Sequence, residues 1–112
     1  MVNTMRAQTI QDIFDVSQTF ASGKRMLLLF ILKNEPMGYT VITKYFQKME
    51  VPIGSSEVYK HLRQLLDGGF ITKKSNNYVL TLKGLKAVEN TMDIINTPPT
   101  VPEVKLSFKR SK

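Results

Sequence analysis

The sequence contains no cysteine and only one histidine. Disulfides and thiolate metal sites are therefore excluded. A structural zinc site needs about four ligands, so no metal site is expected either. The sequence also has no phosphate-cradling glycine-rich loop, no nucleophile paired with a base and no paired carboxylates in an apolar context. These absences predict a protein that is not an enzyme and uses no cofactor.

Long apolar runs are missing as well. The longest run, Met26–Leu32, has seven residues, whereas a membrane-spanning helix needs roughly twenty. The N-terminus carries Arg6 without an apolar run behind it, which is not the pattern of a signal peptide. We therefore expect a cytoplasmic protein that does not enter a membrane.

Acidic residues are scarce relative to basic ones. The chain has 16 Lys and Arg against 9 Asp and Glu, a net charge of +7, and a pI near 9.8. A protein this basic usually meets a polyanion, which can be DNA, RNA or an anionic membrane. The alternative is that the charge only keeps the protein in solution. A length of 112 residues with 42% hydrophobic residues predicts one small domain with one core.

The spacing of apolar residues predicts a mostly α-helical chain with one small β-hairpin, the α+β class. Ser22 is the expected N-cap of the second helix, Ser55 or Ser56 that of the fourth, and Gly68-Gly69 its stop. Helices are predicted over 9–20, 23–33, 40–49, 55–67 and 83–95, and strands over 37–39, 70–72 and 78–80. In the third helix the residues predicted to face inward are Val41, Ile42, Tyr45, Phe46 and Met49.

Residues 97–102 (TPPTVP) cannot be helical and mark a linker. The sequence therefore predicts a domain over 1–96, followed by the linker and a basic tail over 97–112. Residues 103–112 carry a net charge of +3, and we expect them to form a mobile arm that adds affinity for a polyanion. Alternatively, Val104, Leu106 and Phe108 alternate like one face of a strand that could pair with an exposed edge.

The most informative stretch is 54–84, GSSEVYKHLRQLLDGGFITKKSNNYVLTLKG. It combines a helix with a polar face, a Gly-Gly break, two strands around a polar turn, and the start of another helix. The chain resembles winged-helix transcription regulators, and within them PadR-like and ArsR-like proteins. In those families an xxVYxxLxxLxxxGxI run closes the recognition helix, and an xLTxxGxxA run follows the wing. The matching residues here are Val58, Tyr59, Leu62, Leu65, Gly69, Ile71, Leu80, Thr81, Gly84 and Ala87.

The resemblance implies a winged helix-turn-helix with extra N- and C-terminal helices. It also implies that helix 55–67 enters the major groove of double-stranded DNA, while the wing over 73–77 contacts the backbone or minor groove. The candidate DNA-binding residues are Ser55, Ser56, Tyr59, Lys60, Arg63, Gln64, Lys73, Lys74 and Asn76. The alternatives are a solvated amphipathic helix and a solvated hairpin.

Within helix 55–67, ideal geometry gathers Val58, Tyr59, Leu62, Leu65 and Leu66 on one side and places Ser56, Lys60 and Gln64 opposite. Glu57 on the same helix is unfavourable near phosphates, because its carboxylate carries a charge of the same sign. His61 is expected to be a surface or half-buried residue and not a ligand. The metal sensing of ArsR-like proteins does not carry over, because the chain lacks their clusters of Cys, His and carboxylates.

Two apolar patterns favour a homodimer. The Met26–Leu32 run leaves its helix without a polar side, and Leu85, Val88, Met92 and Ile95 form a stripe along the last helix. Alternatively, the terminal helices cover each other within one chain.

The sequence thus predicts a homodimeric, sequence-specific regulator of transcription that binds double-stranded DNA. A repressor is favoured because no activation module is present. The rival interpretations are a winged-helix protein–protein adaptor and an RNA-binding or nonspecific nucleic-acid-binding protein.

Overall fold

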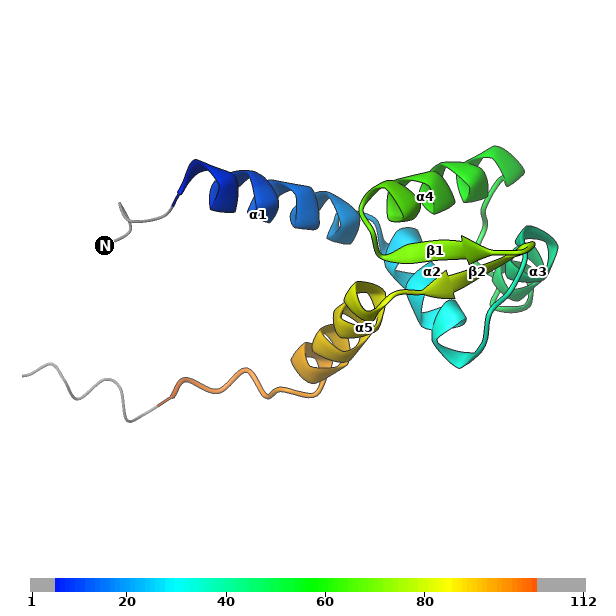
Figure 1. The fold of residues 1–112 in the computed structure, drawn as a ribbon. Coiled ribbons are helices and arrows are strands. Elements are labelled where there is room, and N and C mark those ends of the chain that lie inside the picture. Colours follow the sequence, from blue (N-terminus) through cyan, green and yellow to red (C-terminus); the bar gives the residue numbers. More distant parts are fainter. Residues whose placement is uncertain (1–5, 103–112) are drawn as a thin grey trace, which may run out of the picture.

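The protein is described here by a computed structural model that covers residues 6–102. Five helices and one antiparallel hairpin make up this part of the chain (Figure 1), which confirms the predicted α+β class. The elements are α1 (Ala7–Phe20), α2 (Gly23–Asn34), α3 (Tyr39–Lys48), α4 (Ser55–Asp67), β1 (Ile71–Lys74), β2 (Asn77–Leu80) and α5 (Leu82–Ile95). The predicted basic arm over 103–112 lies outside the described residues.

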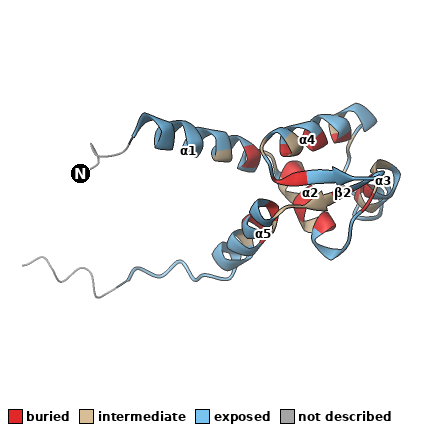
Figure 2. Ribbon diagram, viewed as in Figure 1, coloured by how far each residue is buried: buried red, intermediate tan, exposed pale blue. Residues whose placement is uncertain are grey.

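Helix α2 lies at the centre of the molecule. It contacts α1, α3, α4, α5 and β2, and its buried side chains include Leu28, Leu29, Ile31 and Leu32. Figure 2 shows the buried residues gathered around it. Much of the apolar run Met26–Leu32 is thus buried in the chain's own core, while Met26, Leu27 and Phe30 stay partly exposed. A part of this run in a dimer stays a prediction.

The hairpin is longer toward its tip than predicted. Ile71 pairs with Leu80 and Lys74 with Asn77, so the turn consists of Ser75 and Asn76 alone, with Ser75 in the left-handed region at φ 56°. Such a two-residue turn needs residues that tolerate positive φ. The predicted strand over 37–39 is reduced to one bridge between Met37 and Tyr78, because α3 already begins at Tyr39.

Two local predictions about the other helices need correction. Ser22 caps α2 as expected and accepts a hydrogen bond from the Arg25 amide at 3.2 Å. The N-cap of α4, however, is Gly54, and Ser55 is already helical. In α3, Ile42 and Phe46 are buried and Tyr45 is half-buried, but Val41 and Met49 are exposed.

The residues around Thr81 join the start of α5 to the end of α4. The Thr81 hydroxyl caps α5 by accepting from the Gly84 amide at 3.1 Å, and it donates to the Gly69 carbonyl at 2.6 Å. Lys83 Nζ donates to the Gly68 carbonyl at 2.9 Å. A Cβ on Gly84 would lie 2.1 Å from the Phe70 carbonyl oxygen. The LTxxG run is therefore the point where α5 passes directly over the chain between α4 and β1.

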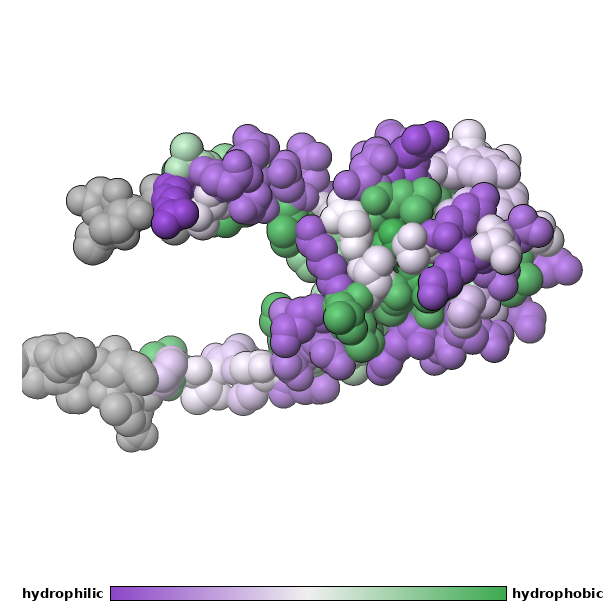
Figure 3. Space-filling model, in the orientation of Figure 1, coloured by the Kyte–Doolittle hydropathy of each residue, from purple (hydrophilic) through white to green (hydrophobic). Residues whose placement is uncertain are grey.

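Helices α1 and α5 extend from the body on the same side (Figure 1). Thr19 is the one buried residue of α1, and Phe14 is 60% exposed. In α5, Val88 is fully buried in the chain's own core, whereas Met92 and Ile95 are exposed. Figure 3 shows apolar surface on the sides of the two helices that face each other. The predicted stripe on α5 therefore divides into a core part and an exposed part.

Among the described residues, no helix has the length and hydropathy that crossing a membrane requires.

We predict that Gly84→Ala lowers the free energy of unfolding by at least about 1–3 kcal/mol, the usual cost of forcing extra atoms into a packed site. Gly23→Ala is the matched control, since a Cβ there meets nothing within 4 Å, and it is expected to be neutral or slightly stabilising. Urea unfolding of the two variants measures the difference. Equal stabilities would show that the close approach at Gly84 is not a constraint.

Candidate nucleic-acid interface

Helix α4 is rotated about its axis relative to the sequence prediction. Its buried residues are Val58, His61, Leu62 and Leu65, whereas Tyr59 is 56% exposed. At about 100° per residue this moves the core-facing side by roughly 50°. The predictions that the Tyr59 ring is part of the core and that His61 lies on the surface or is half-buried are both wrong.

The rotation decides which polar residues lie opposite the core. Ser56, Tyr59, Lys60 and Arg63 form the outward face of α4, and all are exposed. Gln64 is also exposed but lies on the flank, where it lines a cavity shared with α1 and α5. Arg63 therefore takes the central place that the sequence prediction gave to Gln64.

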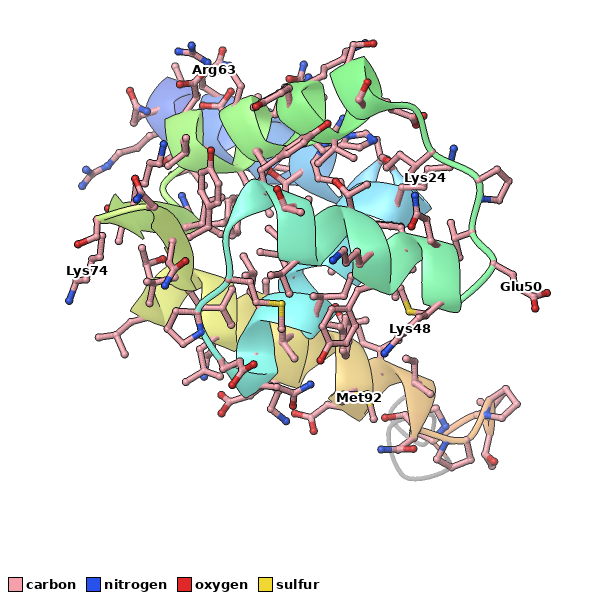
Figure 4. All side chains as sticks on the ribbon, turned by 90° about the vertical axis from the view of Figure 1, so that its right-hand side faces the viewer. Lys24, Lys48, Glu50, Arg63, Lys74 and Met92 are labelled. Carbon is pink, nitrogen blue, oxygen red and sulfur yellow. The ribbon has the colours of Figure 1, made fainter. Side chains whose placement is uncertain are left out.

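The hairpin adds a second group of cations beside this face. Lys73, Lys74 and Asn76 are exposed, and Lys73 Nζ lies 5.3 Å from the centre of the Tyr78 ring. Arg63 on α4 and Lys74 on β1 project on the same side of the molecule, whereas Lys48 on α3 lies away from both (Figure 4). The recognition face, defined as Ser55, Ser56, Tyr59, Lys60, Arg63, Lys73, Lys74 and Asn76, thus comes from two neighbouring elements.

A pair of tyrosines supports the first turn of α4. The rings of Tyr39 and Tyr59 are stacked, with centroids 4.2 Å apart and an interplanar angle of 9°. The Tyr39 hydroxyl also donates to the Ser55 carbonyl at 3.2 Å. Tyr39 was not among the predicted site residues, because periodicity within each helix carries no signal for a contact between helices. Its contacts fix α3 against the N-terminal turn of α4.

Glu57 is removed from the recognition face by a contact with α2. Lys24 Nζ lies 3.2 Å from Glu57 Oε2, and this hydrogen bond is the main reason that the pKa of Glu57 is lowered. The carboxylate is therefore already paired on the side of α2. The positive charge of Lys24 offsets the charge of the Glu57 carboxylate, so Glu57 repels phosphates less than an unpaired carboxylate would.

Behind the recognition face, His61 belongs to a buried polar network. Its side chain accepts a hydrogen bond at Nδ1 from Arg25 Nε at 3.3 Å, so the proton of the neutral ring is on Nε2. Nε2 lies 3.4 Å from Glu57 Oε2 but makes no hydrogen bond among the described residues. Burial is the main cause that lowers the pKa of His61; Glu57 acts in the opposite direction, and the charges of Arg25 and Lys24 add to the lowering. The balance favours the neutral ring.

Arg25 extends from His61 to the end of α1. Its Nη1 donates to the Gln18 carbonyl, and the side chain is buried at the edge of the cavity. The cavity has a volume of about 470 Å³ and is lined by Asp15, Gln18, Thr19, Arg25, Gln64, Asp67, Gly68 and Lys83. Within residues 6–102, no three His, Cys, Asp or Glu side chains come together in a way that could hold a metal ion.

The helices, the hairpin and the bridge at Met37 together form a winged helix. No protein-family model and no curated protein matches the chain. Among solved structures, it is similar to the crystal structure of Bacillus subtilis PadR, with a TM-score of 0.57 and 27% sequence identity. The match covers 70% of this chain but 44% of PadR, so the chain corresponds to less than half of that protein. The similarity supports the winged-helix assignment and the resemblance found in the sequence.

The environment of His61 predicts how stability depends on pH. Because its pKa in the folded chain lies below the usual 6.5, the unfolded chain binds more protons in the interval between the two values. The free energy of unfolding should therefore be constant above about pH 7.5 and fall as the pH drops below about 6.5. The lowered pKa of Glu57 affects stability only below its own usual value of 4.5, outside this interval.

Urea unfolding between about pH 5.5 and pH 8 measures this dependence. His61→Asn is the matched variant, because an Asn oxygen can still accept from Arg25 but does not titrate. It should lose most of the pH dependence in this interval. Identical slopes for the two proteins would contradict the assignment of the effect to His61.

Proposed function

We propose that this chain is a sequence-specific, double-stranded DNA-binding regulator of transcription that acts as a homodimer. The observation that carries the proposal is the exposed outward face of α4 beside the lysines of the hairpin, on a winged-helix frame similar to PadR. A helix about 10–12 Å in diameter fits the major groove. Of the two carboxylates on α4, Glu57 is paired with Lys24, and Asp67 lies in the last turn of the helix, so the first turns of the outward face carry the unpaired charge of Lys60.

Each part of the recognition face has a proposed role. Arg63 and Lys60 reach base edges or phosphates from the middle of α4. Ser55 and Ser56 lie in its first turn, where backbone amides and the helix dipole favour a phosphate. Tyr59 offers its hydroxyl to the backbone beside the groove. Lys73, Lys74 and Asn76 place the hairpin on the phosphate ridge, which positions the protein without reading sequence.

The exposed apolar side chains of α1 and α5 support the homodimer. Apart from Leu82 at the start of α5, they are Ile10, Ile13, Phe14 and Phe20 on α1 and Met92, Ile94 and Ile95 on α5. Since apolar side chains on an extended helix are stabilised by removal from water, a second copy packed against α1 accounts for them. A two-fold dimer presents two copies of α4 to an inverted repeat. Bound across a promoter, such a dimer would act as a repressor by excluding other proteins.

Binding to DNA is tested by selecting sequences from a random duplex pool and measuring affinity against salt. We expect the logarithm of affinity to fall by about 0.9 per phosphate contact for each unit of log salt concentration. Lys60, Arg63, Lys73 and Lys74 from two subunits would give a slope of several units. No binding at low salt would favour the adaptor interpretation. Equal affinity for selected and random duplexes would favour nonspecific binding.

Substitutions on the recognition face should separate into two classes. Arg63→Ala should cost about 1–3 kcal/mol on the selected duplex and relax the preference at one base pair. Lys74→Ala should weaken selected and random duplexes by similar factors. Gln64→Ala, on the flank of α4, should have the smaller effect, and Lys86→Ala, exposed on α5, serves as the charge control. Equal losses from Arg63→Ala on both duplexes would mean that α4 only positions the protein.

The dimer is tested at Phe14, which is exposed in the single chain and would be buried against the second copy. A carboxylate buried there without a partner would cost several kcal/mol. Phe14→Glu should therefore give a folded monomer with much weaker binding to an inverted repeat. Leu82→Glu is the control, because Leu82 is 87% exposed and lies at the start of α5. Analytical ultracentrifugation at tens of micromolar measures the oligomeric state of the wild type and of both variants. A monomeric wild type would refute the dimer.

A further inference from the structure

We infer that Arg25 and His61 together fix the orientation of α1 relative to α4, and that this link sets the spacing of DNA half-sites that the dimer accepts. The inference rests on the proposed function for its effect on DNA. The link itself is a property of the single chain. Arg25 is thus a positioning residue, which acts through α1 and α4 and need not touch DNA.

Helix α1 has little else to hold it. Thr19 is its one buried residue, and only Ala21 and Ser22 separate α1 from α2. Another contact near its end is an edge-to-face pair of Phe20 and Phe70, whose ring centroids are 6.4 Å apart. A single ring pair constrains the direction of a helix less than hydrogen bonds from a planar guanidinium do. The angle of α1 therefore depends on directional bonds.

Arg25 supplies those bonds in two directions. Nη1 donates to the Gln18 carbonyl in the last turn of α1, and Nε donates to His61 Nδ1 in the middle of α4 at 3.3 Å. A guanidinium is planar and its donors point in fixed directions, so a bond at each end orients the two helices. One side chain of α2 thus joins the helix proposed for dimerisation to the helix proposed for recognition.

The charges around the link are consistent with a positioning role. Arg25 is 9% exposed, and its two acceptors are a carbonyl and a neutral imidazole, neither of them a carboxylate. Lys24 is occupied by Glu57, and Asp15 and Asp67 line the adjoining cavity. Burying a guanidinium without a carboxylate in direct contact is costly. A core of apolar side chains could join α1 to α4 at less cost, but without fixing an angle.

In a two-fold dimer formed through α1, the angle between α1 and α4 decides where the second α4 lies. Recognition helices of such dimers occupy half-sites about one helical turn, roughly 34–36 Å, apart or at multiples of it. Inserting one base pair moves a half-site by about 3.4 Å and turns it by about 35° around the DNA axis. If the angle between α1 and α4 is fixed, the dimer cannot reach the shifted half-site and loses affinity. If the angle can vary, the second α4 can still reach it.

The test compares Arg25→Lys with the wild type on inverted repeats whose half-site spacing is the selected one or is changed by one base pair. The wild type should lose at least about tenfold in affinity when the spacing changes, and Arg25→Lys less than about threefold, because a flexible lysine does not fix the angle. Affinity for a single half-site should be equal in both. Lys24→Ala is the matched control, since Lys24 contacts α4 through Glu57, and it should keep the wild-type spacing preference.

A second measurement uses no DNA. Because the chain has no cysteine, Gln11→Cys on α1 and Ser56→Cys on α4 can carry a unique pair of spin labels, diluted with unlabelled protein. The distribution of distances between the labels should be narrow in the wild type and clearly broader in Arg25→Lys. If Arg25→Lys does not fold, His61→Leu, whose side chain has no hydrogen-bond acceptor, replaces it in both experiments.

The outcomes separate the inference from the proposed function. An unchanged spacing preference together with an unchanged distance distribution in the variant would overturn the inference. A loss of single half-site binding equal to the loss on the inverted repeat would also overturn it, because Arg25 would then support α4 alone. Absence of any DNA binding by the wild type would refute the proposed function, while the distance distributions would still decide whether the link is rigid.

Discussion

Helix α2 carries an apolar run that leaves it no polar side, so it is stable only where other elements cover it all round. Contacts from α1, α3, α4, α5 and β2 provide that cover, and each of these elements has one face directed at α2 as a result. For α4 this means that Val58 and Leu62 are committed to the core and that the polar residues opposite must face outward. The recognition face is therefore a consequence of how the central helix is buried.

The distribution of charge follows the same geometry. Lys24 and Arg25 stand at the start of α2, directly behind α4, and each engages one of the two ionisable groups that α4 turns toward α2. Lys24 pairs with Glu57 and Arg25 donates to His61. The Glu57 carboxylate is thus paired, and burial lowers the pKa of His61. The charges on the exposed side of α4 are then those of Lys60, Arg63 and, in the last turn, Asp67.

Local signals were sufficient to predict the order of the helices and the hairpin, the Ser22 cap, the Gly-Gly stop and the exposure of the candidate site residues other than Tyr59. The rotation of α4 could not be predicted, because the ideal-helix pattern allows either Tyr59 or His61 beside Leu62. The choice is made by distant partners: Tyr39 stacks on Tyr59, and Arg25 donates to His61 from 36 residues away. For the same reason, the sequence could not tell that Leu29 and Val88 are buried within the chain while Met92 is not.

The shortness of the hairpin limits how much sequence such a regulator can distinguish. Strands of four residues joined by a two-residue turn reach about 13 Å, enough for the phosphate ridge, so on the proposed function base reading falls to α4. Its outward residues can specify roughly four base pairs, or about eight for a dimer, which distinguishes about 65,000 sequences. A genome offers about 10⁶ or more competing sites. A dimer with this hairpin would therefore find many matching sites by chance, and selective control of one promoter would require several operators placed side by side.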